Sequence, residues 1–183
     1  MPIPVKVWAF FCTTKLRKVR SSTNEKLTQI LSFVFVIAVF LFGAGQISSP
    51  LYEKSPTPLT IETTEGASVQ FQTVVVTEPA DLQRGLMHIK HLAVNQSMLF
   101  VYQESTSATF WMKNTYVSLD LLFIAADGLV VDIHHHATPL STDQISSSHE
   151  VVAVLEINAG LCQKLGIKAG SVVRHSILGT SKT

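Results

Sequence analysis

Short runs of β-branched and aromatic residues recur along the chain from residue 69 onward. Alternation of apolar and polar residues over about four to eight positions is typical of half-buried strands, and short continuous apolar runs are typical of fully buried ones. The pattern predicts strands at 69–77, 98–102, 108–114, 119–125, 129–134 and 151–157, with a last strand after Gly170. Asp127-Gly128 lies between two of these runs and predicts a tight hairpin.

Two short helices are expected between the strands. Glu78-Pro79 favours a helix start, and this helix is expected to reach about Met87. Asn158 is expected to cap a second helix over 159–165, which Gly166 would end in the left-handed conformation. The strands outnumber the helices and do not alternate with them, which disfavours a parallel doubly wound sheet. We therefore expect an α+β fold that is mostly β: a compact, barrel-like, mainly antiparallel sheet with two short helices.

One segment ahead of these elements has a different character. Residues 30–42 are apolar except for Ser32, and the uncharged stretch widens to 27–45, a length of 19 residues that can cross a bilayer core. The shorter apolar core of 13 residues is also typical of a signal peptide. The sequence thus predicts an N-terminal hydrophobic helix at 27–45 that serves as a signal peptide or as a membrane anchor, and both readings stay open.

Charge is distributed unequally about that segment. Residues 1–29 carry six Lys or Arg and one Glu, a net charge of +5, whereas the residues after 45 carry eight Lys or Arg and twelve Asp or Glu, a net charge of −4. Because basic flanks stay in the cytoplasm, residues 1–26 are expected there and the rest in the periplasm, anchored to the inner membrane if 27–45 is not cleaved. An acidic body lacks the basic face that binds phosphates, so a nucleic-acid partner is not expected.

The exported part divides into a linker and one domain. Residues 46–59 are rich in Pro and Ser and predict a linker, and residues 60–180 predict a single β-rich domain of usual size. Cys12 and Cys162 are the two cysteines of the chain. The predicted topology puts them on opposite sides of the membrane, so we expect no disulfide. Cys162 is expected to be a small buried residue of the second helix.

Several motifs follow one another in an order typical of a known family. They are Arg84-Gly-Leu-Met87, Met98-Leu-Phe100, Phe110-Trp-Met-Lys-Asn-Thr115, Leu119-Asp-Leu-Leu-Phe-Ile124, Asp127-Gly128, Val154-Leu-Glu-Ile-Asn-Ala-Gly160 and Leu165-Gly-Ile-Lys-Ala-Gly170. Over about residues 60–175 the chain resembles the bacterial and archaeal family called domain of unknown function number 192. The resemblance implies a small exported protein with a compact β-rich fold, and it brings no agreed catalytic residues.

Polar residues in the predicted strands provide a candidate ligand site. Trp111 and Lys113 would share one strand face, where an indole offers a stacking surface and an ammonium a point charge. Glu156 interrupts an apolar strand, and a buried carboxylate is costly unless paired, so Lys113 is its expected partner. We expect a groove for a small polar ligand lined by Trp111, Lys113, Asn114, Asp120 and Glu156. In a purely structural reading, Lys113 pairs with either carboxylate, Asn114 bonds turn backbone and Trp111 fills the core.

A hydrolase-like enzyme is one alternative function. A paired, partly buried carboxylate is typical of a general base, so Glu156 or Asp120 would fill that role. The chain lacks the nucleophile elbow, the zinc-protease helix, the phosphate-binding glycine loop and the dinucleotide fingerprint. The leading hypothesis is therefore a non-enzymatic ligand-binding or accessory envelope protein. We expect it to need no cofactor and to have a small polar ligand or an envelope protein as its partner.

A histidine-based metal-binding protein is the other alternative. His134 and His136 are two positions apart, so in a regular strand they would share one face with Asp132. Imidazole and carboxylate ligands suit zinc or copper, and His149 or His175 would have to complete the site. Because the spacing supplies part of a ligand set, the sequence assigns no metal ligand.

Overall fold

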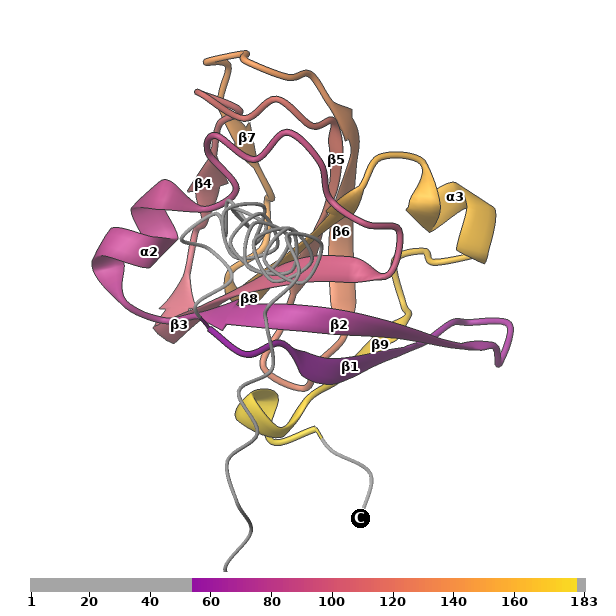
Figure 1. Ribbon diagram of the computed structural model, residues 1–183. Coiled ribbons are helices and arrows are strands. Elements are labelled where there is room, and N and C mark those ends of the chain that lie inside the picture. The colour runs from indigo at the N-terminus through magenta and orange to yellow at the C-terminus, as the bar shows by residue number, and fades with distance from the viewer. Residues whose placement is uncertain (1–53, 181–183) are drawn as a thin grey trace, which may run out of the picture. The chain divides into compact units, whose positions relative to one another are not determined.

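Seven strands form one curled sheet in the computed structural model, which describes residues 54–180 (Figure 1). The strands are β1 (Thr57–Glu62), β2 (Ser68–Val76), β3 (Gln96–Thr106), β4 (Thr109–Phe110), β5 (Leu119–Ile124), β6 (Val130–Ala137), β7 (Ile145–Ser146), β8 (Val151–Asn158) and β9 (Val172–Arg174). The helices are α2 (Pro79–Arg84), α3 (Leu161–Leu165) and the 3-10 helix η2 (Ser176–Leu178). The sheet has the order β6-β5-β8-β3-β2-β1-β9, and β4 pairs with β7 separately.

The sheet curls until its two edge strands approach each other. Neighbouring strands are antiparallel except β2 and β3, which run parallel. Leu129, next to β6, forms a bridge with Val172 of β9, and the Val130 N–H donates to the Ser171 carbonyl at 2.8 Å. The expected mostly-β, mainly antiparallel, barrel-like fold with two short helices is therefore confirmed, in the form of a half-barrel.

Apolar side chains pack on both faces of this sheet, because successive strand residues point in opposite directions. The first core cluster includes Met98, Phe100, Leu121, Phe123 and Val154, together with residues from the segment after α2. The second core cluster includes Leu99, Leu122, Leu155, Ile157 and Cys162, with two leucines of α3 packed against it. Cys162 is fully buried, as predicted. The two clusters fix which face of the sheet each polar side chain occupies.

β5 and β6 are joined by the hairpin that the sequence predicts. Gly128 has a φ of 85°, and its N–H donates to the Ala125 carbonyl at 2.9 Å. The Asp127 side chain accepts the Leu129 N–H at 3.0 Å. A Cβ added at Gly128 would lie 2.7 Å from the Val173 carbonyl oxygen. Both the positive φ and this close approach require glycine here.

Several strands differ from the predictions. Strands β1 and β7 were not predicted, and β3 and β6 extend beyond their predicted ends at 102 and 134. β1 begins at Thr57, so Leu59, expected in the linker, lies in the sheet with its side chain fully buried. β4 covers Thr109–Phe110 alone, so the strand predicted over 108–114 is wrong beyond that pair. Met112 is nevertheless buried in the first core cluster. The alternation of apolar and polar residues after Phe110 therefore reflects the burial of Met112 in a loop and not a strand.

The first helix, α2, forms where it was expected but is shorter. It begins with Pro79, directly after Glu78, and ends at Arg84 rather than near Met87. Gly85 follows with a φ of 47° and a ψ of −136°, which no helical residue adopts. The chain therefore turns sharply at the end of α2.

The cap predicted for the second helix, α3, is wrong. Gly160, not Asn158, occupies the N-cap position. The Asn158 side-chain amide instead donates to the carbonyls of Leu92 and Ala93, at 2.9 and 3.1 Å. The predicted end is confirmed, because Gly166 follows the helix in the left-handed conformation with a φ of 70°.

No helix within residues 54–180 is long and apolar enough to cross a membrane. The predicted hydrophobic helix at 27–45, the basic region at 1–26 and most of the 46–59 linker lie outside the described residues. Their expected roles stay predictions.

Candidate functional site

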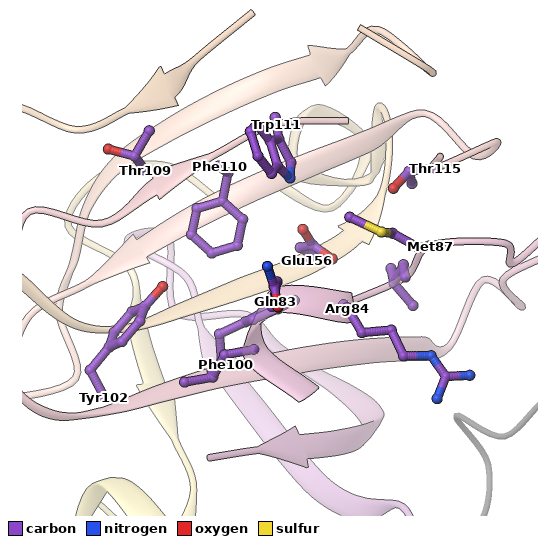
Figure 2. A pocket seen from close by; sticks show the side chains of 13 residues that line it. Gln83, Arg84, Met87, Phe100, Tyr102, Thr109, Phe110, Trp111, Thr115 and Glu156 are labelled. Carbon is purple, nitrogen blue, oxygen red and sulfur yellow. The ribbon is translucent and has the colours of Figure 1, made fainter. Parts of the chain in front are cut away.

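A pocket of about 220 Å³ opens on the face of the sheet that carries the first core cluster. Residues of α2, of the turn after it and of β3, β4 and β8 form its walls (Figure 2). Its polar and aromatic lining includes Gln83, Arg84, Tyr102, Phe110, Trp111 and Glu156. The pocket thus combines aromatic surface with several hydrogen-bonding groups.

Glu156 lines this pocket from within β8. The residue is 5% exposed, and its Oε2 atom is buried and has no hydrogen-bond partner within residues 54–180. Burial raises the pKa of Glu156 to about 8, because the charged form is poorly solvated there. The carboxyl group is therefore mostly protonated at neutral pH, and it offers both an O–H donor and acceptor oxygens.

The strand pattern explains why this carboxyl group is buried. Side chains alternate along β8, so Glu156 projects from the same face as Val154, a residue of the first core cluster. Its neighbours across the sheet are Met98 of β3 and Leu121 of β5, and both are fully buried. Neither neighbour can donate a hydrogen bond from its side chain, which leaves the pocket as the direction from which a partner would come.

Close packing shapes the wall beside Glu156. The rings of Phe100 and Phe110 meet edge to face, with centroids 5.1 Å apart. Gly85 lies against Phe100, since a Cβ added there would be 3.0 Å from the ring. A glycine directly after α2 therefore lets the chain turn tightly over the aromatic wall and brings Met87 into the pocket lining.

Tyr102, Gln83 and Arg84 add polar groups around Glu156. Burial first, and then the negative charge of an ionised Glu156, raise the pKa of Tyr102 to about 12, so its hydroxyl stays protonated. In Figure 2 the Gln83 side chain reaches toward Glu156, whereas the Arg84 guanidinium points away from it. The groups nearest the carboxyl are therefore uncharged at neutral pH.

Trp111 and Glu156 are the two predicted site residues that line this pocket. The residue Trp111 is 46% exposed, so its indole forms a pocket wall and does not fill the core. The predicted pair between Lys113 and Glu156 is wrong. The Lys113 ammonium instead lies over the Trp111 ring, 5.6 Å from its centroid, in a cation–π contact. The reason is that strand β4 ends at Phe110, so Lys113 lies in a loop and does not continue the strand alternation on which the prediction rested.

Asn114 and Asp120, the other two predicted residues, lie elsewhere. Asn114 has a φ of 58°, and its main-chain carbonyl accepts the His88 N–H at 2.8 Å. This bond is made by the backbone and not by the side chain, to which the structural reading gave that role. Asp120 is fully buried and pairs with Ile157, a residue of the second core cluster. It therefore projects from the face opposite Glu156. The five residues do not line one groove, because the sheet separates the two carboxyl groups.

The pocket wall that follows α2 was not predicted from the sequence. The motif Arg84-Gly-Leu-Met87 indicates a backbone bend, but nothing in it indicates that the bend faces Glu156, far along the chain. Tyr102 likewise reads as an ordinary strand residue. The available signal was Gly85 itself, because a glycine at a helix end permits close backbone approach.

The histidines of the alternative metal-binding hypothesis do not form a cluster of metal ligands in the described residues. A register shift between β5 and β6 places His136 in a bulge with a φ of 54°, so it no longer alternates regularly with His134. His149 is exposed. His175 is buried, which lowers its pKa, and its ring contacts the Thr57 hydroxyl at 2.9 Å. The predicted combinations of these four positions therefore do not form a ligand set.

The sequence profile of one family matches residues 60–175, which is more than half of the chain. The protein belongs to the domain of unknown function 192 family. This family is described as an uncharacterized ACR, and the match confirms the resemblance carried by the motifs. The pocket residues from Gln83 to Glu156 all fall within the matched range of this domain of unknown function 192 protein.

Two solved structures are similar to this domain of unknown function 192 protein. One, from Sinorhizobium meliloti 1021 and proposed in its description to be a transcription regulator, is 35% identical with a TM-score of 0.65, over 67% of this chain and 96% of its own. The other, a protein of unknown function from Novosphingobium aromaticivorans DSM 12444, is 33% identical with a TM-score of 0.66, over 69% of this chain and 89% of its own. No curated protein matches the chain.

Proposed function

We propose that this protein binds a small polar molecule in the Glu156 pocket. The observation that carries the proposal is the buried Oε2 atom, which has no hydrogen-bond partner among the described residues although the side chain lines an open pocket. A buried polar atom without a partner costs about 1–3 kcal/mol. A ligand that completes this hydrogen bond would recover that free energy.

The lining groups define the chemistry of the ligand. A protonated carboxyl donates and accepts, so it suits a hydroxyl, an amide or a second carboxyl group. Trp111 and Phe110 offer flat apolar surface for a ring or a short carbon chain. The volume of about 220 Å³ lies below the ~300–1,000 Å³ usual for drug-sized ligands. A molecule of metabolite size fits these properties.

We place this domain in the periplasm, either free or held at the inner membrane by residues 27–45. The support is the net charge of +5 ahead of the hydrophobic segment, which is typical of a cytoplasmic flank. The net charge of −4 after residue 45 argues against nucleic acid as the ligand. The description of the Sinorhizobium meliloti protein as a transcription regulator is therefore not extended to this chain.

A hydrolase-like enzyme is the second candidate, because a pKa near neutrality suits Glu156 as an acid or base. Asp120 cannot act with it, since the two carboxyl groups lie on opposite faces of the sheet. Tyr102, with a pKa of about 12, is a poor base at neutral pH. We favour binding over catalysis because the aromatic side chains that line the pocket suit ligand binding, whereas Glu156 as a general acid or base would have no catalytic partner among Asp120 and Tyr102.

The first experiment is native mass spectrometry of the full-length chain released from detergent micelles. We expect a bound small molecule that is lost in Trp111→Ala, because the exposed indole supplies pocket surface without supporting the core. Glu156→Gln keeps a donor and an acceptor, so binding should be retained within about tenfold. Lys113→Ala is the matched control. Its side chain contacts the indole but does not line the pocket, so we expect the ligand to remain.

Three outcomes separate the alternatives. Chemical turnover of the bound molecule that disappears in Glu156→Gln while binding persists would establish the hydrolase. A ligand retained equally by Trp111→Ala and by the wild-type protein would place the binding site elsewhere. If no molecule is bound, and a panel of polar metabolites gives no change in melting temperature, the binding proposal is wrong.

A further inference from the structure

Three different metal-binding side chains converge on the face of the sheet opposite Glu156. They are Asp120 of β5, His135 of β6 and Cys162 of α3, and one donor atom from each lies within 4.8 Å of the other two. The residues are far apart in the sequence, so the fold itself brings them together. We propose that this Asp120–His135–Cys162 cluster is a site for a divalent transition-metal ion of the zinc class, independent of the ligand pocket.

The spacing of the donors suits tetrahedral coordination. With metal bonds of about 2.0–2.3 Å, the donors around a zinc ion lie roughly 3.4–3.7 Å from one another. The Nδ1 atom of His135 is 3.8 Å from the Oδ1 atom of Asp120, close to that range. The His135 side chain is 48% exposed, so its ring has room to rotate toward the other two donors. Binding therefore requires a small side-chain adjustment and no change of fold.

Irregular backbone holds the cluster in place. Leu119 pairs with Ala137, and Leu121 pairs with His134, so two residues of β6 face Asp120 in a bulge. His136 adopts a φ of 54° there, which is unusual for a residue other than glycine. Bulges and strained residues concentrate at functional sites, where they redirect a side chain. Here the bulge leaves His135 beside the buried carboxylate.

The Asp120 carboxylate is oriented before any ion binds. Its Oδ1 atom accepts the His136 N–H and its Oδ2 atom accepts the Cys162 N–H, both at 3.0 Å. Each carboxylate oxygen has two lone pairs, and the Cys162 thiol also hydrogen-bonds this carboxyl group. A metal ion would replace that thiol hydrogen bond. The bonds to backbone thus play the part of an outer shell that fixes a metal ligand in one orientation.

An opening to solvent gives an ion a route and a fourth coordination position. A pocket of about 600 Å³ is lined by His135, His136 and Cys162, among other residues. Three protein ligands with an open position are typical of zinc sites that hold a water molecule or a substrate. A sulfur ligand disfavours calcium and magnesium, which prefer oxygen donors. On binding, the Cys162 thiol would release its proton to solvent as the sulfur–metal bond forms.

Cobalt titration of the full-length chain in detergent tests the site, because Co²⁺ substitutes for zinc and its bond to a thiolate gives a charge-transfer absorption. The protein for this titration is prepared without a histidine tag. It carries Cys12→Ser, so that Cys162 is its only thiol. We expect the thiolate band to appear on Co²⁺ addition and to vanish in Cys162→Ser. His135→Ala should weaken Co²⁺ binding at least tenfold. Loss of an outer-shell partner alone weakens metal binding by about 10–100-fold, and the loss of a direct ligand should cost no less.

His134→Ala is the matched control, because it removes a neighbouring imidazole that is not part of the cluster. We expect it to leave Co²⁺ affinity within about twofold. Equal weakening by His134→Ala and His135→Ala would show adventitious histidine binding and overturn the proposal, as would the absence of a thiolate band. Circular dichroism without metal checks each fold. If Cys162→Ser does not fold, the test rests on the Co²⁺ affinities of His135→Ala and of its control His134→Ala, because both side chains are exposed.

Discussion

Two carboxyl groups lie buried on neighbouring strands, and the fold stabilises them in different ways. Asp120 accepts two backbone N–H groups, from His136 and Cys162. Glu156 has Met98 and Leu121 as its neighbours across the sheet, and its Oε2 atom has no hydrogen-bond partner in the part of the chain that the structure describes. A carboxyl group that is buried in apolar surroundings without a partner favours its protonated form, which is the case for Glu156. The consequence for Glu156 is that the stability of the protein depends on pH.

Glu156→Gln should abolish a pH dependence of folding. The pKa of Glu156 rises from 4.5 to about 8 on folding, so between these values the folded state holds a proton that the unfolded state has lost. This group therefore contributes stability that is full below pH 4.5 and is lost as the pH rises through about 8. Urea unfolding at pH 5 to 9 should show the wild-type protein losing several kcal/mol relative to Glu156→Gln, since each pKa unit corresponds to about 1.4 kcal/mol.

The comparison with Glu156→Gln isolates one group. His175, whose pKa burial lowers, titrates in both proteins and so cancels in the difference. The variant should be the more stable of the two above pH 8, because glutamine keeps the shape without the charge. Stability curves that stay parallel over the whole range would show that Glu156 is ionised in the folded protein and would remove the basis of its proposed role as a donor.

At the scale of the elements, tight turns with a glycine connect two pairs of consecutive strands. Gly66, between β1 and β2, and Gly128, between β5 and β6, both have a positive φ, 83° and 85°. A Cβ at Gly66 would meet nothing within 4 Å. A Cβ at Gly128 would lie 2.7 Å from the Val173 carbonyl oxygen in β9, where the curled sheet comes together. The two glycines thus share a conformation and differ in their surroundings.

Alanine at these two positions separates conformation from packing. Gly66→Ala should cost about 1 kcal/mol, the strain of a left-handed alanine. Gly128→Ala adds a clash with backbone that cannot rotate away, and we expect a further loss of about 1–3 kcal/mol. Urea unfolding of both variants measures the difference. Equal losses would mean that β9 moves aside without cost and that the closure of the half-barrel is loose.

Local signals explain which elements were predictable from sequence. The β5–β6 hairpin and the end of α3 depend on Asp127-Gly128 and on Gly166, whose conformations are set by neighbouring residues. The stretch after Phe110 depends on tertiary burial of Met112, so its alternation gave a false strand. Propensity is overridden by such contacts, which no local pattern reports.

The candidate site, like the fold, was predictable where a single residue gives a local signal and not where tertiary contacts decide the geometry. Glu156 stands out in sequence because a carboxyl group in an apolar strand needs an explanation, and the structure places it in a pocket with Trp111. The predicted partner of Glu156 was wrong, since the position of Lys113 depends on where strand β4 ends. The proximity of His135 to Asp120 requires a bulge, which shifts the register by an amount that alternation cannot reveal.

At the scale of the whole molecule, one curled sheet carries the two proposed sites, which differ in chemistry. The Glu156 pocket faces one side with an aromatic wall, and the Asp120–His135–Cys162 cluster faces the other with metal-binding groups. Because strands β5 and β8 contribute to both faces, the sites share a rigid support without sharing side chains. A metal and a small polar ligand would therefore bind independently.

The proposed location gives the last prediction, which concerns the orientation of the chain. Alkaline phosphatase folds only after export, so a fusion after Thr183 should be active in a Gram-negative host, and a fusion after Lys26 should be inactive. In the proposed topology the basic flank at 1–26 sets this orientation. Replacing Lys15, Arg17, Lys18 and Arg20 by glutamate should therefore lower the activity of the Thr183 fusion severalfold. Activity of the Lys26 fusion, or an inactive Thr183 fusion that is fully expressed, would contradict a periplasmic domain.

Fractionation of the same cells separates a signal peptide from an anchor. A cleaved protein should appear in the soluble periplasmic fraction with a mass that lacks the residues before 46. An anchored protein should stay with the membrane at its full mass and resist extraction by high salt, because 19 uncharged residues hold it by the hydrophobic effect and not by charge. Release of the full-length chain by salt would show that the hydrophobic segment does not span the bilayer. The orientation inferred from its charged flank would then be wrong as well.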